Sequence, residues 1–80
     1  MARGLEEKTT LFMDIESIGA SNLRGFKYKD SNSDQTYTIL KGFPGRIKPH
    51  NSSFRVQYSN GRIESIKVKE NHYDDIRVIN

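Results

Sequence analysis

The chain has 80 residues, of which 34% are hydrophobic and none is cysteine or tryptophan. A disulfide framework and a thiolate metal site are therefore excluded, and phenylalanine and tyrosine must supply much of a small core. No apolar run approaches the roughly 18 residues of a membrane span, and the N-terminal MARGLEEKTT lacks the apolar stretch of a signal peptide. We expect one cytoplasmic domain over residues 1–80, complete from its initiator Met, with residues 1–10 as a flexible arm.

Charge is unevenly distributed along the chain, although the net charge is only +3. Residues 23–69 hold ten basic and three acidic residues, a net +7. Residues 1–22 and residues 70–80 each carry a net −2. The chain therefore has a basic middle between acidic ends, an asymmetry that its overall charge understates.

The first segment, TTLFMDIESIGASN at residues 9–22, fits two structures. Its apolar residues at positions 11, 13 and 15 alternate as in a strand, whereas those at 11, 15 and 18 form a helical stripe. In the helical interpretation Thr10 is the N-cap and Gly19 ends the helix. The β-branched pair Thr9-Thr10 and the short span favour the strand, but the pattern leaves both structures open.

The next segment, GFKYKDSNSDQTYTIL at residues 25–40, predicts a hairpin around a polar loop at residues 31–34. A four-residue loop sets three pairs across the strands: Asp30 with Gln35, Tyr28 with Tyr37, and Phe26 with Ile39. This register places the large apolar residues on one face and the intervening lysines and threonines on the other. The GFPG motif that follows, at residues 42–45, predicts a turn between strands.

A second hairpin is predicted by SFRVQYSNGRIESIKVK at residues 53–69. Asn60-Gly61 is a strong signal for a two-residue turn, which pairs Tyr58 with Ile63 on the core face. Strict alternation would then turn the apolar residues at 66 and 68 away from the core. We expect a β-bulge near Glu64-Ser65 to correct this, because a bulge shifts the alternation by one residue.

These registers predict a core of ten largely buried residues: Phe26, Tyr28, Tyr37, Ile39, Phe54, Val56, Tyr58, Ile63, Ile66 and Val68. After the second hairpin, KENHYDD predicts a short helical turn and IRVIN a final strand. We therefore expect an all-β fold of about five short antiparallel strands with a short helical turn before the last strand.

The last third of the chain resembles SH3-like barrels. The residues that carry the resemblance are Asn60-Gly61-Arg62 in a distal hairpin, Asn71-His72-Tyr73 in the helical turn, and Ile76 to Ile79 in the last strand. The resemblance implies a small all-β barrel. The aromatic-rich opening motif and the tryptophan of peptide-binding SH3 domains are missing, and no Tudor-like aromatic cage is evident, so neither binding activity is implied. SNLRGFKY and FRVQYSNG also resemble parts of the small domain appended to some bacterial lysyl-tRNA synthetases, although a long segment separates them here.

No pattern in the sequence predicts catalysis. A G-x-S-x-G elbow and a glycine-rich phosphate loop are both missing. His72 with Asp74 and Asp75 offers nitrogen and oxygen donors at short spacing, but without cysteine or a nearby second histidine this is no recognised zinc pattern. The two aspartates are more typical of a helix cap than of acid–base chemistry. We expect no enzyme, no metal and no cofactor.

Nucleic-acid binding is one of two functions that the sequence favours. Nine basic residues lie on or beside the two hairpins, and several alternate with core positions, so they share an exposed face that can neutralise phosphates. With the bulge in place, Arg62, Lys67 and Lys69 project outward beside Arg55 as a basic ridge. The predicted binding residues are Arg46, Lys48, Arg55, Arg62, Lys67 and Lys69.

The second function is protein interaction. The acidic N-terminal segment and exposed strand edges can add to a partner's sheet, and the basic ridge can bind an acidic protein surface. Small adaptor or inhibitor proteins that dock on a larger machine, including those made by bacteriophages, share this profile. A solvated basic face that protects sheet edges with lysine remains the simpler explanation of the charges.

Overall fold

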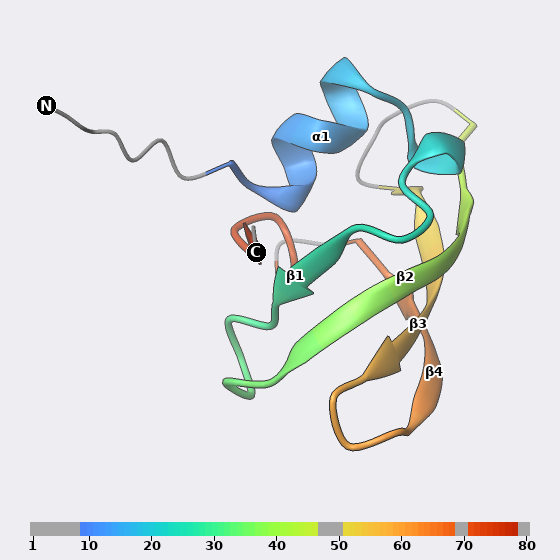
Figure 1. Cartoon of the computed structure of the whole chain (residues 1–80). Helices are drawn as coiled ribbons and strands as arrows, with labels where there is room; N and C mark the ends of the chain where they lie inside the picture. The colour runs from blue at the N-terminus through green and yellow to red at the C-terminus, as the bar shows by residue number, and fades with distance from the viewer. Residues whose placement is uncertain (1–8, 47–50, 69–70, 79–80) are drawn as a thin grey trace, which may run out of the picture.

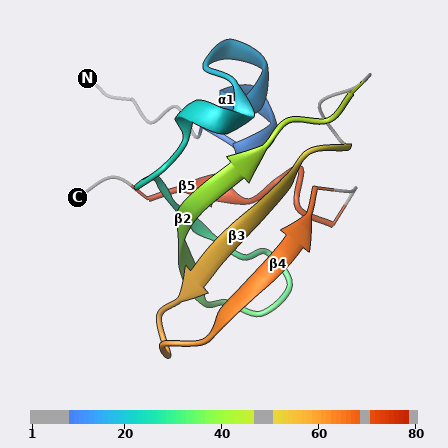
Figure 2. The same ribbon diagram turned by 90° about the vertical axis from the view of Figure 1, so that its right-hand side faces the viewer.

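The computed structural model describes residues 9–46, 51–68 and 71–78, which contain one antiparallel sheet (Figure 1). Its strands are β1 (Lys27–Lys29), β2 (Thr36–Phe43), β3 (Ser53–Tyr58), β4 (Ile63–Lys67) and β5 (Ile76–Arg77). They follow the order β4-β3-β2-β1-β5, so β1 to β4 form a meander and β5 pairs with β1. The expected all-β fold is confirmed. Figure 2 shows that the sheet curls, which places β5 behind β2 and β3.

The segment that fitted both a strand and a helix forms α1 (Leu11–Ser17), followed by the 3-10 helix η1 (Ala20–Asn22). The preference for a strand was wrong. The hydroxyl of Thr10 accepts a hydrogen bond from the N–H of Met13 at 3.2 Å and so caps the helix. Leu11 and Ile15 are buried on the helical face that packs on the core. The β-branched pair Thr9-Thr10 does have an extended backbone, but this extended stretch is limited to the two residues that pair with β5.

The first hairpin has the expected register. Tyr28 lies opposite Tyr37, and the N–H of Asp30 donates to the carbonyl of Gln35 at 2.7 Å to close the loop. Asp34 adopts a left-handed backbone conformation, with φ of 63°. Aspartate tolerates this region better than most residues, which explains why a polar loop without glycine can turn here.

The second hairpin closes through three residues instead of the expected two. The N–H of Tyr58 donates to the carbonyl of Arg62 at 2.8 Å, and the N–H of Gly61 donates to the carbonyl of Tyr58 at 2.8 Å. Residues 59–61 therefore form the loop. Gly61 has φ of 94°, the left-handed conformation that three-residue hairpin loops require and that glycine adopts without strain.

This turn corrects two predictions. The extra residue lies in the turn, so β3 and β4 pair in an unbroken register and the bulge expected near Glu64-Ser65 is not formed. Ile63 lies opposite Gln57 on the outer face of the sheet and is 49% exposed, so it is not part of the core. Ile66 still faces the core, because a three-residue loop shifts the alternation as a bulge would.

A bulge does occur, but in β2. The pairing of β2 with β3 passes from Ile39 opposite Val56 to Lys41 opposite Arg55, and Leu40 is the extra residue. Such a bulge bends the strand and reverses which residues face outward beyond it. Lys41 therefore projects from the outer face of the sheet, beside Arg55.

Beyond the bulge, β2 touches η1 at Gly42. A Cβ at this position would lie 2.0 Å from the carbonyl oxygen of Ala20 and 2.9 Å from the ring of Phe54. Only glycine fits such a backbone approach, so Gly42 fixes η1 against the sheet.

The core lies inside the curl of the sheet, with α1 above it (Figures 1 and 2). Seven of the ten residues expected in the core are buried, while Phe26 and Tyr58 are half-buried. The helical segments and the residue that follows them add four buried hydrophobic residues: Leu11, Ile15, Ala20 and Leu23. Before β5, residues 71–74 form a turn that the N–H of Asp75 closes by donating to the carbonyl of His72 at 3.3 Å.

Candidate functional site

Three tyrosines lie side by side across β1, β2 and β3, and each phenol donates a hydrogen bond to an aspartate. The bonds join Tyr28 to Asp14 at 2.6 Å, Tyr37 to Asp75 at 2.5 Å, and Tyr58 to Asp30 at 3.1 Å. Burial, reinforced by the neighbouring carboxylates, raises the pKa of Tyr28 and Tyr37 far above the ordinary value and that of Tyr58 to about 12. The phenols therefore stay protonated and act as donors.

The Asp75 carboxylate is fully buried and also accepts bonds from Nδ1 of His72 at 2.9 Å and the N–H of Ser31 at 3.0 Å. Burial raises the pKa of Asp75, but the bonds from His72, Tyr37 and Ser31 outweigh it and leave the pKa below its ordinary value. The bond to Asp75 likewise raises the pKa of His72, against the opposing effect of burial. Asp75 fastens the last turn to the first hairpin through the bonds that it accepts from Ser31 and Tyr37.

The same region offers a possible set of metal donors, since single ligand atoms of Asp30, His72 and Asp75 lie within 4.8 Å of one another. The carboxylate oxygens already accept hydrogen bonds, however: Asp30 from Tyr58 and from the N–H of Asn32, and Asp75 as described above. A cation would have to displace these donors. The arrangement suits a hydrogen-bonded core network better than a ligand set.

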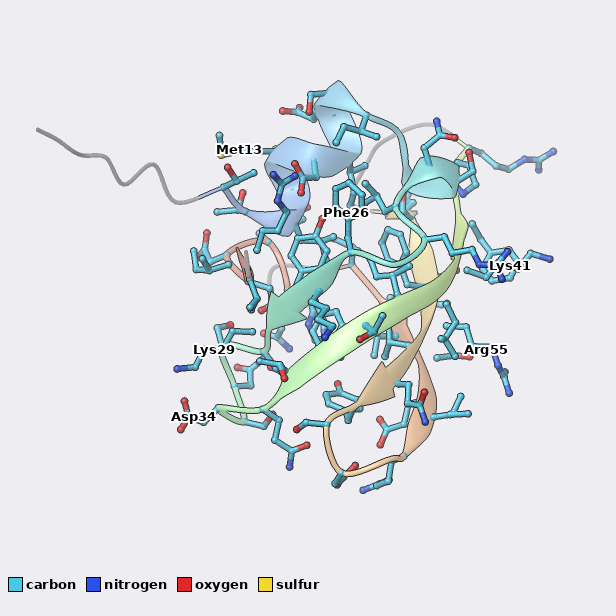
Figure 3. All side chains as sticks on the ribbon, in the orientation of Figure 1. Met13, Phe26, Lys29, Asp34, Lys41 and Arg55 are labelled. Atoms are coloured by element: carbon cyan, nitrogen blue, oxygen red, sulfur yellow. The ribbon has the colours of Figure 1, made fainter. Side chains whose placement is uncertain are left out.

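The outer face of the sheet is basic over β2, β3 and β4. Lys41 lies directly opposite Arg55, and Figure 3 shows both side chains projecting to the same side of the molecule. Arg55 is also opposite Ser65, which is two residues from Lys67 on β4. We call Lys41, Arg55 and Lys67 the basic face; all three are exposed.

No carboxylate faces these cations from the strands that the structure describes. The outward positions of β2, β3 and β4 are occupied by threonine, serine, glutamine, Phe43 and Ile63 besides the three bases. Like charges directly opposite each other destabilise a sheet, as Lys41 and Arg55 do here. An anion placed between them would remove this repulsion.

The structure brings together only part of the expected ridge. Arg55 and Lys67 lie on the basic face. Arg62 lies directly before β4 and pairs at 2.7 Å with Glu64, which is on the other face of that strand. Arg62 there borders a hollow between the two hairpin loops, lined also by Asp30 and Tyr58. Arg46 is exposed after β2. Lys48 and Lys69 lie outside the described residues.

Two residues on the outer face of the sheet, Lys41 of the basic face and Phe43 beside it, were not among the predicted binding residues. Lys41 joins it because of the bulge at Leu40, and Phe43 because β2 continues into the GFPG motif that predicted only a turn. Phe43 is 45% exposed, and Nζ of Lys41 lies 5.3 Å from the centroid of its ring. The sequence does indicate that Lys41 and Phe43 share a face, because residues two apart on a strand point to the same side.

A comparison with known proteins found no matching family model, curated protein or solved structure. None of the helices in the described residues is long and apolar enough to cross a membrane. The function must therefore be inferred from the chemistry of the site itself.

Proposed function

We propose that this protein is a non-enzymatic module that binds nucleic acid through its basic face. The observation that carries the proposal is the direct opposition of Lys41 and Arg55, with Lys67 beside them and no outward carboxylate on the described strands of that face. Phosphates would relieve the repulsion between these cations, and the counterions that they release would supply affinity. The planar guanidinium of Arg55 can also bind a phosphate through two hydrogen bonds.

The proposed architecture is an SH3-like barrel in a cytoplasmic protein. The order of the strands supports the SH3-like barrel, because a four-strand meander is closed by a last strand that pairs with the first. A chain without cysteine suits a reducing compartment, which supports the cytoplasmic location.

The test compares two triple variants that remove the same charge. In the first, Lys41, Arg55 and Lys67 are replaced by serine; in the control, three other exposed bases, Arg24, Lys29 and Arg62, are replaced by serine. Lys29 and Arg62 of the control already pair with Asp34 and Glu64. Affinity for a fluorescently labelled oligonucleotide is measured by anisotropy at several salt concentrations. We expect the first variant, but not the control, to bind more weakly than the wild type. Its slope of log affinity against log salt concentration should be flatter than that of the wild type by about 2–3.

Equal losses in the two variants would mean that net charge, and not this face, governs binding. Unchanged affinity in a folded first variant would contradict the proposal. Circular dichroism and the unfolding midpoint of each variant show whether the fold is intact.

Protein interaction remains a second candidate, favoured by the position of β4. Among the strands that the structure describes, β4 ends the sheet and pairs with β3 alone, and it carries the exposed Ile63. An unpaired strand edge with an apolar residue beside it is a template for strand addition by a partner. A stoichiometric protein recovered from nuclease-treated lysate, and lost when Ser65→Pro blocks the edge, would support this function.

A further inference from the structure

An aromatic ring stands within the basic face. Phe43 lies two residues from Lys41 on the outer side of β2 and opposite Ser53 on β3, whose short side chain leaves the ring 45% exposed. On the far side of Ser53 lies Lys67 of β4. Adjacent strands are about 4.8 Å apart, so Phe43 has a cation beside it on its own strand and another about two strand spacings away.

An exposed aromatic ring beside cations should bind one form of nucleic acid in preference to another. In a duplex the bases are stacked on one another and only their edges and the phosphates are accessible, so an aromatic ring on a sheet gains little. A single strand can turn an unpaired base onto such a ring while its phosphates contact the neighbouring cations. Tyr28, Tyr37 and Tyr58 cannot serve this purpose, because their phenols are bonded to aspartates on the core side. The ring of the fourth tyrosine, Tyr73, packs against Phe12 with the ring centroids 4.8 Å apart.

We propose that the basic face binds single-stranded nucleic acid, with one base stacked on Phe43 and phosphates bound by Lys41, Arg55 and Lys67. The proposal rests on the proposed function and adds the form of nucleic acid and the stacking residue. The ammonium of Lys41 lies over one face of the Phe43 ring, 5.3 Å from its centroid. A base therefore stacks on the other face or displaces this ammonium, which in either case stays near enough to contact the adjoining phosphate. Stacking is tolerant of sequence, since every base has a flat face.

The experiment measures binding of labelled single-stranded DNA, single-stranded RNA and a DNA duplex of matched length at one salt concentration. Four proteins are compared: wild type, Phe43→Leu, Phe43→Tyr and Ile63→Ala, the last removing an exposed apolar side chain from the same face. We expect the wild type to prefer single strands. Phe43→Leu should weaken single-strand binding by about 5- to 150-fold, the contribution of one stacked base, without changing the salt slope. Phe43→Tyr and Ile63→Ala should bind as the wild type does.

A second measurement uses the absence of tryptophan from the chain. Phe43→Trp introduces a single tryptophan at the proposed stacking position, and its fluorescence can be excited apart from that of the tyrosines. Its emission should be quenched by a single strand and not by the duplex. Equal affinity for duplex and single strand, or wild-type single-strand affinity in folded Phe43→Leu, would overturn this inference and leave the proposed function standing. If neither form binds, the proposed function fails and the inference with it.

Discussion

Hydrogen bonds between aspartates and tyrosines determine which charged side chains of this chain lie at the surface. Asp14, Asp30 and Asp75 are buried, and each accepts a tyrosine hydrogen bond. Asp14 also accepts a long bond from Nη1 of Arg77, at 3.4 Å. Buried carboxylates need such donors to offset their lost hydration. Three of the acidic side chains thus turn inward, and the lysines and arginines of β1 to β4 stay at the surface.

The pair of His72 and Asp75 should make stability depend on pH. The pKa of His72 is raised above its ordinary value of 6.5 in the folded protein. Its contribution is therefore complete below pH 6.5 and is lost as pH rises through the raised pKa. Asp75, whose pKa is lowered from 3.8, remains ionised over this range and loses its contribution only on stronger acidification. We expect the free energy of unfolding to decline on the alkaline side of 6.5.

Urea unfolding between about pH 5.5 and 9 measures this decline, and an NMR titration of the imidazole gives the pKa directly. His72→Gln, which keeps a hydrogen-bond donor but cannot titrate, is the comparison protein. The effects of other titrating groups are common to both proteins and cancel in the difference. Parallel curves for the two proteins would contradict the expectation.

At the scale of the element, short helices and turns here depend on single residues. α1 has only seven residues, too few to be stable by itself, so it relies on its cap and on the packing of Leu11 and Ile15. The second hairpin depends in the same way on Gly61, whose left-handed backbone allows the three-residue loop. The length of that loop determines which side chains of β4 face the core.

Loss of the helix cap should therefore destabilise the whole protein. Thr10→Ala removes the acceptor for the N–H of Met13 and should lower the free energy of unfolding by about 0.5–2 kcal/mol. Thr10→Asn keeps an acceptor at the same position and should restore most of the loss. Ser17→Ala, at the exposed far end of α1, is the control and should change stability little. Equal stability of Thr10→Ala and Ser17→Ala in chemical unfolding would show that the cap contributes nothing.

At the scale of the whole molecule, the sheet separates a core side from a charged side. The inner surface of the curl holds the tyrosine row with Ile39, Phe54 and Val56, and α1 lies over it. The outer surface of β2, β3 and β4 carries the basic face, with Phe43 and Ile63 as exposed apolar residues. This separation lets the outer face vary in charge without loss of the core.

Substitutions on the two sides of one hairpin should reveal this separation. Val56 is fully buried, and Val56→Ala should lower the free energy of unfolding by about 1–3 kcal/mol. Ile63 is 49% exposed, and Ile63→Ala should change stability by less than about 0.5 kcal/mol. The two unfolding midpoints are compared under the same conditions. A loss in Ile63→Ala as large as that in Val56→Ala would show that the hairpin has the two-residue turn and a different register.

The sequence by itself determined the all-β class and the first hairpin. Alternation is a local property, so Tyr28 and Tyr37 could be placed opposite each other and seven core residues assigned without knowledge of the tertiary structure. It also indicated two members of the basic face, Arg55 and Lys67, because both alternate with core positions.

Only the tertiary structure decided the rest. Thr9 and Thr10 extend because β5 lies beside them, and the next residues become helical because Leu11 and Ile15 can bury one face on the core. Asn60-Gly61 suits either a two-residue or a three-residue loop, and the need to bury Ile66 can be met by an extra residue in the turn or in the strand. The bulge at Leu40, which places Lys41 beside Arg55, leaves no local signal at all. Loop length and bulges are set by how distant strands fit together, and that fit is a property of the packed molecule.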